Sequence, residues 1–424
     1  MSLPLVPNSL TRGESNPPAT APTGIARGTP AYRWVTIAFF LVGFASFSLI
    51  YCVQPLFTTF VQSFHIGAAQ STLALSLTTG LLAVSILLMS MLGPQLSRRT
   101  VMFSCMTAAA VLTLLSAGST SWAALLFLRA AEGVVLGGVP AIAMASLAEL
   151  IDPRDLGRAM GLYVGGTAFG GMMGRVGMGL LTDIASWRVA LLTMGALALL
   201  AALGFRLLVP GTARAQQVTP LQIQDHLSIW RAHLGRWPLL RLFLIGALNL
   251  GVFVAVFNAL SFRLSGAPYH LGAATLSALF TVYLFGVVAS PVGGALADRW
   301  GRSRVLTGGL LLSGTGLLLT LLPNLLDIVA GLVLLTVGFF TTHSVASSWV
   351  SRAAPAHTCH ASALYLLAYY VGSSILGFAG AWCWTAGGWP WVVTFTAAAL
   401  MLALVIAGRP ELKKVSSPAS SHHG

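Results

Sequence analysis

Twelve long apolar stretches follow one another along this chain of 424 residues, and they restrict its fold more than any other feature. Each is long enough to cross a hydrocarbon core about 30 Å thick as a helix. The spans that we predict are 34–61, 72–92, 101–118, 122–148, 159–181, 189–209, 241–263, 274–296, 304–322, 327–349, 361–384 and 391–408. Charged residues make up only 8% of the chain, against about 25% in soluble domains. The sequence therefore predicts an all-α membrane protein.

Polar segments divide the predicted spans into two groups of six. Residues 1–33 are rich in Pro, Ser, Thr and Gly, so we expect a disordered cytoplasmic tail there. Six-helix bundles are expected at 34–209 and 241–408. A cytoplasmic central loop at 210–240 joins them, and a second cytoplasmic tail occupies 409–424.

Lysine and arginine residues gather on one side of these spans. If the N-terminus is inside, the inner segments hold most of the 23 Lys and Arg residues, whereas the outer loops hold only Arg188 and Arg263. The positive-inside rule then places both termini in the cytoplasm. A net charge of +13 would suggest a nucleic-acid partner in a soluble protein. Here the charge lies beside the predicted spans, which indicates a lipid bilayer and no nucleic acid.

The two groups of spans are related by an internal repeat. Residues 64–69 read FHIGAA and residues 269–274 read YHLGAA, at an offset of 205. Six spans per copy keep both copies in the same orientation, so the repeats are parallel. In transporters built this way, the substrate site lies near the bilayer midplane between the halves.

The segment after the span 274–296 carries a recognisable motif. Its residues include Gly294, Asp298, Arg299, Gly301 and Arg302, and they resemble the G-x-x-x-D-R-x-G-R signature of the major facilitator superfamily. The resemblance implies the fold of that superfamily, with twelve transmembrane helices in two pseudo-symmetric six-helix bundles. The alternative is an ordinary positively charged turn.

The same motif predicts a cytoplasmic gate. The repeat aims Asp298 at the start of the span 159–181, near Arg158, where a carboxylate would meet a cation and a helix N-terminus. The matching loop of the first half, from Gly93 to Arg99, is three residues shorter and lacks the acid. The sequence does not decide what this shortening does to gating.

Two opposite charges lie inside the span 122–148. Arg129 and Glu132 are three residues apart and share a helix face. A charge within a membrane helix costs about 2.5–3.5 kcal/mol on insertion scales, which makes it a functional candidate. Arg129 also matches the superfamily's R-x-x-x-G element, which is implicated in proton coupling. We take Arg129, Glu132 and His343 as proton-coupling candidates, with a static ion pair and a packed histidine as the alternatives.

The span 159–181 is rich in glycine. Gly166, Gly170, Gly171 and Gly174, followed by Arg175, resemble the antiporter motif of drug–proton exchangers. Ordinary close packing of helices would produce the same small residues.

Polar and aromatic side chains within a few spans are our candidates for the substrate cavity. They are Tyr51, Gln54, Arg175, Asn249, Asn258, Thr342, His343, Ser347, Tyr369 and Tyr370. With so few embedded charges, we expect an amphiphilic or neutral polyhydroxyl solute.

Three segments, 51–55, 343–349 and 369–374, resemble the YnfM-type transport proteins of the bacterial inner membrane. The resemblance implies a secondary active transporter that works by alternating access, and we expect it to be a monomer. It also implies proton-coupled efflux of a drug-like, sugar-like or other small metabolite. A uniporter, a facilitator or a transport-inactive membrane sensor remains the alternative. We expect no enzyme activity, no cofactor and no metal, because the chain lacks HExxH, GxSxG and P-loop motifs.

Overall fold

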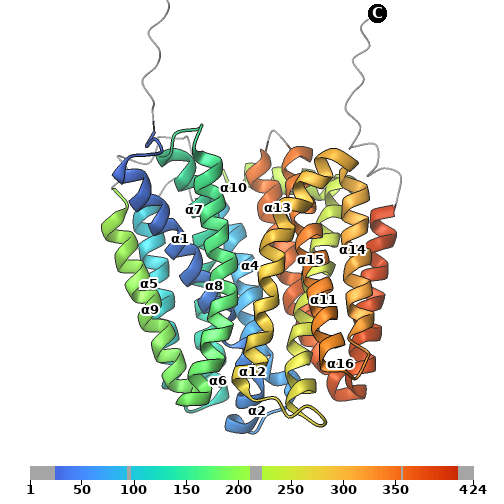
Figure 1. Cartoon of the computed structure of the whole chain (residues 1–424). Coiled ribbons are helices and arrows are strands. Elements are labelled where there is room, and N and C mark those ends of the chain that lie inside the picture. The colour runs from blue at the N-terminus through green and yellow to red at the C-terminus, as the bar shows by residue number, and fades with distance from the viewer. Residues whose placement is uncertain (1–23, 93–96, 211–221, 355–356, 409–424) are drawn as a thin grey trace, which may run out of the picture.

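The computed structural model describes residues 24–92, 97–210, 222–354 and 357–408. In this part of the chain the helices form two bundles that stand side by side (Figure 1). The first contains α1 (Pro30–Tyr51), η1 (Gln54–Leu56), α2 (Phe57–Phe64), α3 (Ala68–Ser71), α4 (Leu73–Leu92), α5 (Arg98–Ala117), α6 (Trp122–Leu136), α7 (Gly138–Leu150), α8 (Leu156–Ile184) and α9 (Trp187–Leu208). The second contains α11 (Trp237–Ser265), α12 (Ala273–Ala278), η3 (Leu279–Val282), α13 (Tyr283–Trp300), α14 (Arg302–Leu319), α15 (Leu325–Ala353) and α16 (Thr358–Gly408).

The twelve predicted spans are confirmed by these helices. Within the described residues, nine helical stretches are long and apolar enough to cross a membrane. One of them, α16, consists of two helices joined at Gly387 and Gly388, where the backbone leaves helical geometry and Gly388 has φ +67°. The helices α8 and α14 complete the set of twelve.

Capping residues explain where several helices begin. Ser121, Ser186 and Asn324 accept a backbone N–H of the first turn of α6, α9 and α15, respectively. Thr29 does the same for α1, which has Pro30 at its first position. Such caps satisfy donors that a helix start leaves free.

The predicted central loop contains a helix, α10 (Ile223–Gly235). Its buried side chains are His226, Trp230 and His233, and they face the start of α16. Residues 211–221 of that loop lie outside the described part of the chain, as do residues 1–23 and 409–424 of the predicted tails and residues 93–96 of the shortened first-half loop.

The repeat seen in the sequence recurs in the backbone. His65 and His270, the matching histidines, are the non-glycine residues with positive φ in the described chain, at 54° and 48°. A glycine lies two residues after each histidine and directly precedes a helix, which is α3 in one half and α12 in the other.

Glycines bring helices together within each bundle. A methyl group on Gly170 or Gly174 of α8 would overlap the backbone of α1 at Phe44 or Ser48. In the second bundle, Gly372 of α16 meets α11 at Ala247 in the same manner. Gly166, Gly170 and Gly174 of the antiporter-like motif therefore pack α8 against a helix of its own bundle.

The two bundles contact each other unevenly along their length. Both described chain ends lie at one end of the molecule, which we call the termini end. Figure 1 shows α2 and α12 at the opposite end, which we call the far end. At the far end Asp183 of α8 accepts the backbone N–H of Ala274 of α12 at 2.9 Å. Nearer the middle, the hydroxyls of Thr79 on α4 and Ser374 on α16 are 2.8 Å apart.

Candidate functional site

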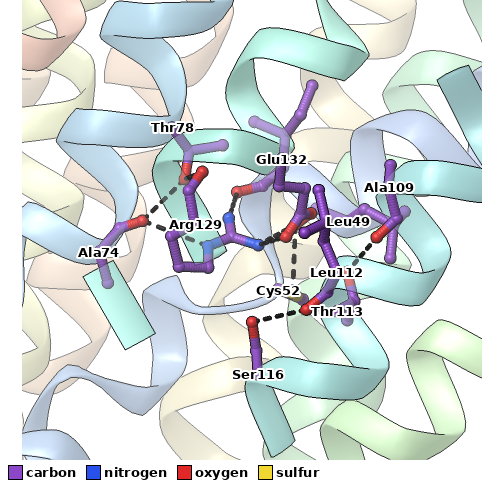
Figure 2. A network of polar contacts seen from close by, with 11 residues as sticks. Leu49, Cys52, Ala74, Thr78, Ala109, Leu112, Thr113, Ser116, Arg129 and Glu132 are labelled. Atoms are coloured by element: carbon purple, nitrogen blue, oxygen red, sulfur yellow. Dashed lines mark hydrogen bonds and ion pairs between the residues drawn. The ribbon is translucent and has the colours of Figure 1, made fainter. Parts of the chain in front are cut away.

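A charged pair is buried in the first bundle, where α6 faces α1 and α4 (Figure 2). Arg129 and Glu132 are both fully shielded from solvent, and Arg129 Nη1 donates to Glu132 Oε2 at 2.6 Å. The helical period brings side chains at this spacing onto one face. The structure therefore forms the ion pair that the sequence suggests.

Backbone carbonyls bind the rest of the Arg129 guanidinium. Nη1 and Nη2 donate to the carbonyls of Leu49 at 3.2 Å and Ile50 at 2.9 Å, and Nε donates to Ala74 at 3.3 Å. Leu49 and Ile50 belong to the last turn of α1, where carbonyls have no partner within the helix. Arg129 thus fastens α6 to the end of α1 and to the start of α4.

The carboxylate of Glu132 is bound on one side only. Its Oε1 accepts no hydrogen bond from the described residues. The nearby Thr113 hydroxyl, shown in Figure 2, donates instead to the carbonyl of Ala109 at 3.0 Å. Because no hydrogen bond from the described chain occupies this oxygen, it is free to take up a proton. Protonation would turn it from an acceptor into a donor.

A second arginine, Arg175 of α8, is buried where the two bundles meet. Its Nε donates to Gln54 Oε1 of η1 at 2.5 Å. The guanidinium carbon lies 4.1 Å from the ring centre of Tyr51, and 5.0 and 4.9 Å from those of Phe280 and Tyr283 in the second bundle. These distances are within the range of cation–π attraction.

The amide of Gln54 continues this contact into the second bundle. Its Nε2 donates to Asn258 Oδ1 of α11 at 2.7 Å, and Asn258 donates in turn to the carbonyl of Gly377. Arg175 also donates to the carbonyl of Gly171, one of the motif glycines. A continuous chain of polar contacts therefore crosses between the bundles. We call Tyr51, Gln54, Arg175, Asn258, Phe280 and Tyr283 the interface cluster.

His343 belongs to an aromatic group inside the second bundle. Its Nδ1 lies 3.0 Å from the hydroxyl of Tyr365, and its ring centre lies 4.5 Å from that of Tyr369. Tyr370 packs edge-on against Tyr369, with ring centres 5.3 Å apart. No contact joins His343 to Glu132 in the described chain, so the three proton-coupling candidates do not form one site.

Three other cavity candidates bind within the second bundle. Asn249 donates to the carbonyl of Phe339 at 3.1 Å. Thr342 faces Gly309 of α14 within the second bundle, so it lies outside the interface cluster. Ser347 donates to a carbonyl one turn back in its own helix, at Ser344.

The predicted gating motif is arranged differently from the expectation. Asp298 lies 3.4 Å from Arg302 and 3.6 Å from Arg352, both in its own bundle, and its side chain is exposed. Arg158 is also exposed, and the described residues show no ion pair between it and Asp298. The predicted link between the bundles at this place is therefore not formed in this conformation.

The rest of the motif builds the turn between α13 and α14. Gly301 has φ +90°, a conformation that residues with a Cβ rarely adopt. Arg299 is exposed beside it, and Gly294 lies one turn before Asp298 on α13, near Ser344.

Sequence reasoning missed several residues of the site. Phe280 and Tyr283 complete the aromatic surroundings of Arg175 from the second bundle. Their spacing of three places both on one helix face, which was the available signal. Thr79 and Asp183 join the bundles, and only a three-dimensional structure brings them to their partners.

Comparisons with known proteins agree with this architecture. The family model of the Major Facilitator Superfamily matches residues 35–267 and 264–423. The uncharacterized MFS-type transporter YybF of Bacillus subtilis (strain 168) is 41% identical over 388 residues, which cover 91% of this chain and 95% of that protein. The inner membrane transport protein YnfM of Escherichia coli (strain K12) is 40% identical over 385 residues, covering 91% and 92%. A crystal structure of the peptide transporter POT has the same fold, with a TM-score of 0.76 at 14% identity over 90% of this chain and 96% of that chain. The chain therefore belongs to the major facilitator superfamily and is a multi-pass membrane transporter.

Proposed function

We propose that this transporter moves a small solute out of a bacterial cell across the cytoplasmic membrane in exchange for protons. The excess of Lys and Arg beside the termini supports an orientation with both termini in the cytoplasm. In that orientation the far end, where Asp183 binds Ala274, is the outer end. The structure then corresponds to an inward-facing state of an alternating-access cycle. Both halves of the site come from one chain, which supports a functional monomer.

The buried Glu132 is the observation on which proton coupling depends. Its partner Arg129 binds the carbonyls of Leu49 and Ile50, directly before Tyr51. Protonation of Glu132 removes the negative charge beside Arg129, so the guanidinium has only carbonyl dipoles left to balance it. The end of α1 then carries the change toward Tyr51 and Gln54, which contact Arg175 at the bundle interface.

The first prediction concerns Glu132→Gln, which removes the proton site and keeps the size of the side chain. Spin labels at Thr120 and Leu322, on far-end loops of the two bundles, report the separation of the bundles by double electron–electron resonance in liposomes. We expect the wild-type distance distribution to shift between pH 8 and pH 5.5, because protonation changes the balance of the two states. Glu132→Gln should give one distribution at both pH values.

Glu149→Gln is the matched control. Glu149 is also a glutamate of the first bundle paired with an arginine, Arg98 at 2.8 Å, but it is partly exposed to solvent. This variant should keep the wild-type response to pH. A wild-type distribution that does not respond to pH would contradict proton coupling and favour a facilitator. A pH response that survives in Glu132→Gln would leave the ion pair with a structural role only.

A further inference from the structure

The charge of Arg175 has no partner of opposite sign in the described part of the chain. Its contacts are the neutral amide of Gln54, the carbonyl of Gly171 and three aromatic rings. Arg129, which is also buried, differs because Glu132 lies 2.6 Å away. The charges of Arg129 and Arg175 are therefore balanced in different ways.

An unpaired buried cation is costly, and neutral contacts offset only part of that cost. Removing an ion from water costs several kcal/mol in proteins. A cation–π contact returns about 0.5–2 kcal/mol, depending on how far it is desolvated. An anion beside Arg175 would therefore stabilise the site more than any neutral group of the same size.

The guanidinium of Arg175 also keeps free donors. Its Nη2 donates no hydrogen bond to the described residues, whereas Nε and Nη1 are occupied. Arginine presents its N–H groups in a planar fork that matches the two oxygens of a carboxylate. The free Nη2 thus offers a first contact to a carboxylate, and displacement of Gln54 from Nε would complete the fork.

The aromatic side chains around Arg175 favour a particular kind of molecule as the carrier of that carboxylate. Tyr51 lies against the guanidinium from the first bundle, and Phe280 and Tyr283 lie against it from the second. Aromatic rings bury large flat apolar surfaces and stack on other rings. Gln54 and Asn258 add an amide pair that can bind one polar substituent.

We propose that the transported solute is an organic anion, a carboxylate on a flat, ring-containing body, and that Arg175 binds its carboxylate. This inference rests on the proposed transport function and names the substrate class of the same site. It replaces the amphiphilic or neutral polyhydroxyl solute that the sequence favours, because Arg175 has no carboxylate partner among the described residues.

The position of Arg175 also connects ligand binding to the contacts between the two bundles. Gln54 binds Arg175 through its carbonyl oxygen and Asn258 of the other bundle through its amide nitrogen. A carboxylate that competes with Gln54 for the guanidinium disturbs the contact between Gln54 and Asn258. Binding and the opening of the bundles therefore act on the same side chain.

Arg263 provides a matched control for Arg175. It also stacks on aromatic rings, those of Tyr269 and Trp389, and it donates to carbonyls instead of a carboxylate. It lies at the end of α11, away from the interface cluster. An effect that depends on any aromatic-stacked arginine would appear in both variants.

The test uses the full-length protein in lipid nanodiscs at pH 7, with isothermal titration of two acids, benzoate and 2-naphthoate, and of their neutral amides. We expect the acids to bind at least about tenfold more tightly than the amides, since a charged hydrogen bond is worth about that much. Arg175→Gln should remove this preference, Arg175→Lys should keep part of it, and Arg263→Gln should keep all of it.

Equal affinity for acids and amides in the wild-type protein, or binding of none of them, would overturn the proposal. The same holds if Arg263→Gln weakens acid binding as much as Arg175→Gln. If Arg175→Gln does not fold, the comparison of acids with amides on the wild-type protein still decides. A failure here leaves the pH response of the spin-labelled protein intact, whereas a failure of proton coupling leaves acid binding at Arg175 intact.

Discussion

A single methyl group decides how closely α8 can approach α1. A Cβ atom on Gly170 would overlap the carbonyl of Phe44, which lies in the backbone of a packed helix and cannot move alone. Ser48 strengthens the same contact, because its hydroxyl donates to the carbonyl of Gly170 at 2.9 Å. The glycine is therefore needed for backbone contact, as in other tightly packed membrane helices.

The second prediction follows from this contact. Gly170→Ala should destabilise the protein by about 1–3 kcal/mol, because overpacking forces the backbone to shift. Gly161→Ala is the matched control on the same helix, since a methyl group there would meet no atom within 4 Å. It should be neutral or stabilise the helix by up to about 1 kcal/mol. Thermal unfolding of the two purified variants in detergent would measure both effects, and equal losses would show that the close contact of Gly170 with Phe44 is not the cause.

Single residues also show which contacts can be predicted from the sequence. The partner of Arg129 lies three residues away on the same helix, so local periodicity was enough to find it. The partners of Arg175 come from α1, η1, η3 and α13, and their meeting depends on how two bundles dock. Sequence periodicity describes one helix at a time and carries no information about that docking.

At the scale of elements, α10 is held on the second bundle by histidines. His226 Nδ1 and His360 Nε2 are 2.9 Å apart, and the rings of His233 and His357 are 6.3 Å apart. A hydrogen bond between two imidazoles needs one neutral ring as acceptor. Protonation of both rings of such a pair would remove the acceptor and weaken the docking of α10. This docked helix cannot be predicted from the sequence, because the segment 210–240 has no apolar span and reads as a loop.

The third prediction gives this dependence a direction. Burial, the neighbouring charge of Arg236 and then His357 lower the pKa of His233 from its usual 6.5. A lowered pKa means that undocked α10 takes up a proton more readily than docked α10. Docking is then strongest well above pH 6.5 and weakens as the pH falls below it, by at most about tenfold per pH unit for the His233 ring.

Hydrogen–deuterium exchange of the α10 amides, corrected for the intrinsic effect of pH, measures this. Exchange should rise between pH 7.5 and 5.5 in the wild-type protein, and His233→Leu should reduce the rise. His65→Gln alters a far-end histidine and should leave it unchanged. An α10 that exchanges equally at both pH values would contradict the argument.

At the scale of the whole molecule, polar contacts between the bundles differ from those within them. At the termini end, Arg98 pairs with Glu149 and Arg352 pairs with Asp298, each within a single bundle. Contacts that join the bundles lie from the middle to the far end, as Thr79 with Ser374 illustrates.

The repeat allowed the two-bundle fold to be predicted, because each copy must bury the same helix faces. Which end is closed is a property of one state of a two-state equilibrium, and the sequence encodes both states.

The fourth prediction tests whether far-end contacts hold this state. Asp183 Oδ2 accepts the backbone N–H of Ala274, at the start of α12, where a carboxylate is favoured by the helix dipole. The aspartate is exposed, so the charge contributes about 0.3–1 kcal/mol. Asp183→Asn should therefore raise the population that is open at the far end by about two- to fivefold.

Asp155 is the matched control, because its Oδ2 accepts the N–H of Arg27 at 2.8 Å within one bundle. With spin labels at Thr120 and Leu322, Asp155→Asn should leave the distance distribution unchanged, while Asp183→Asn should increase its long-distance component. If both variants leave it unchanged, the Asp183 contact accompanies this state without stabilising it, and the closed far end must be held by the packing of α4 against α16 and of α8 against α12 instead.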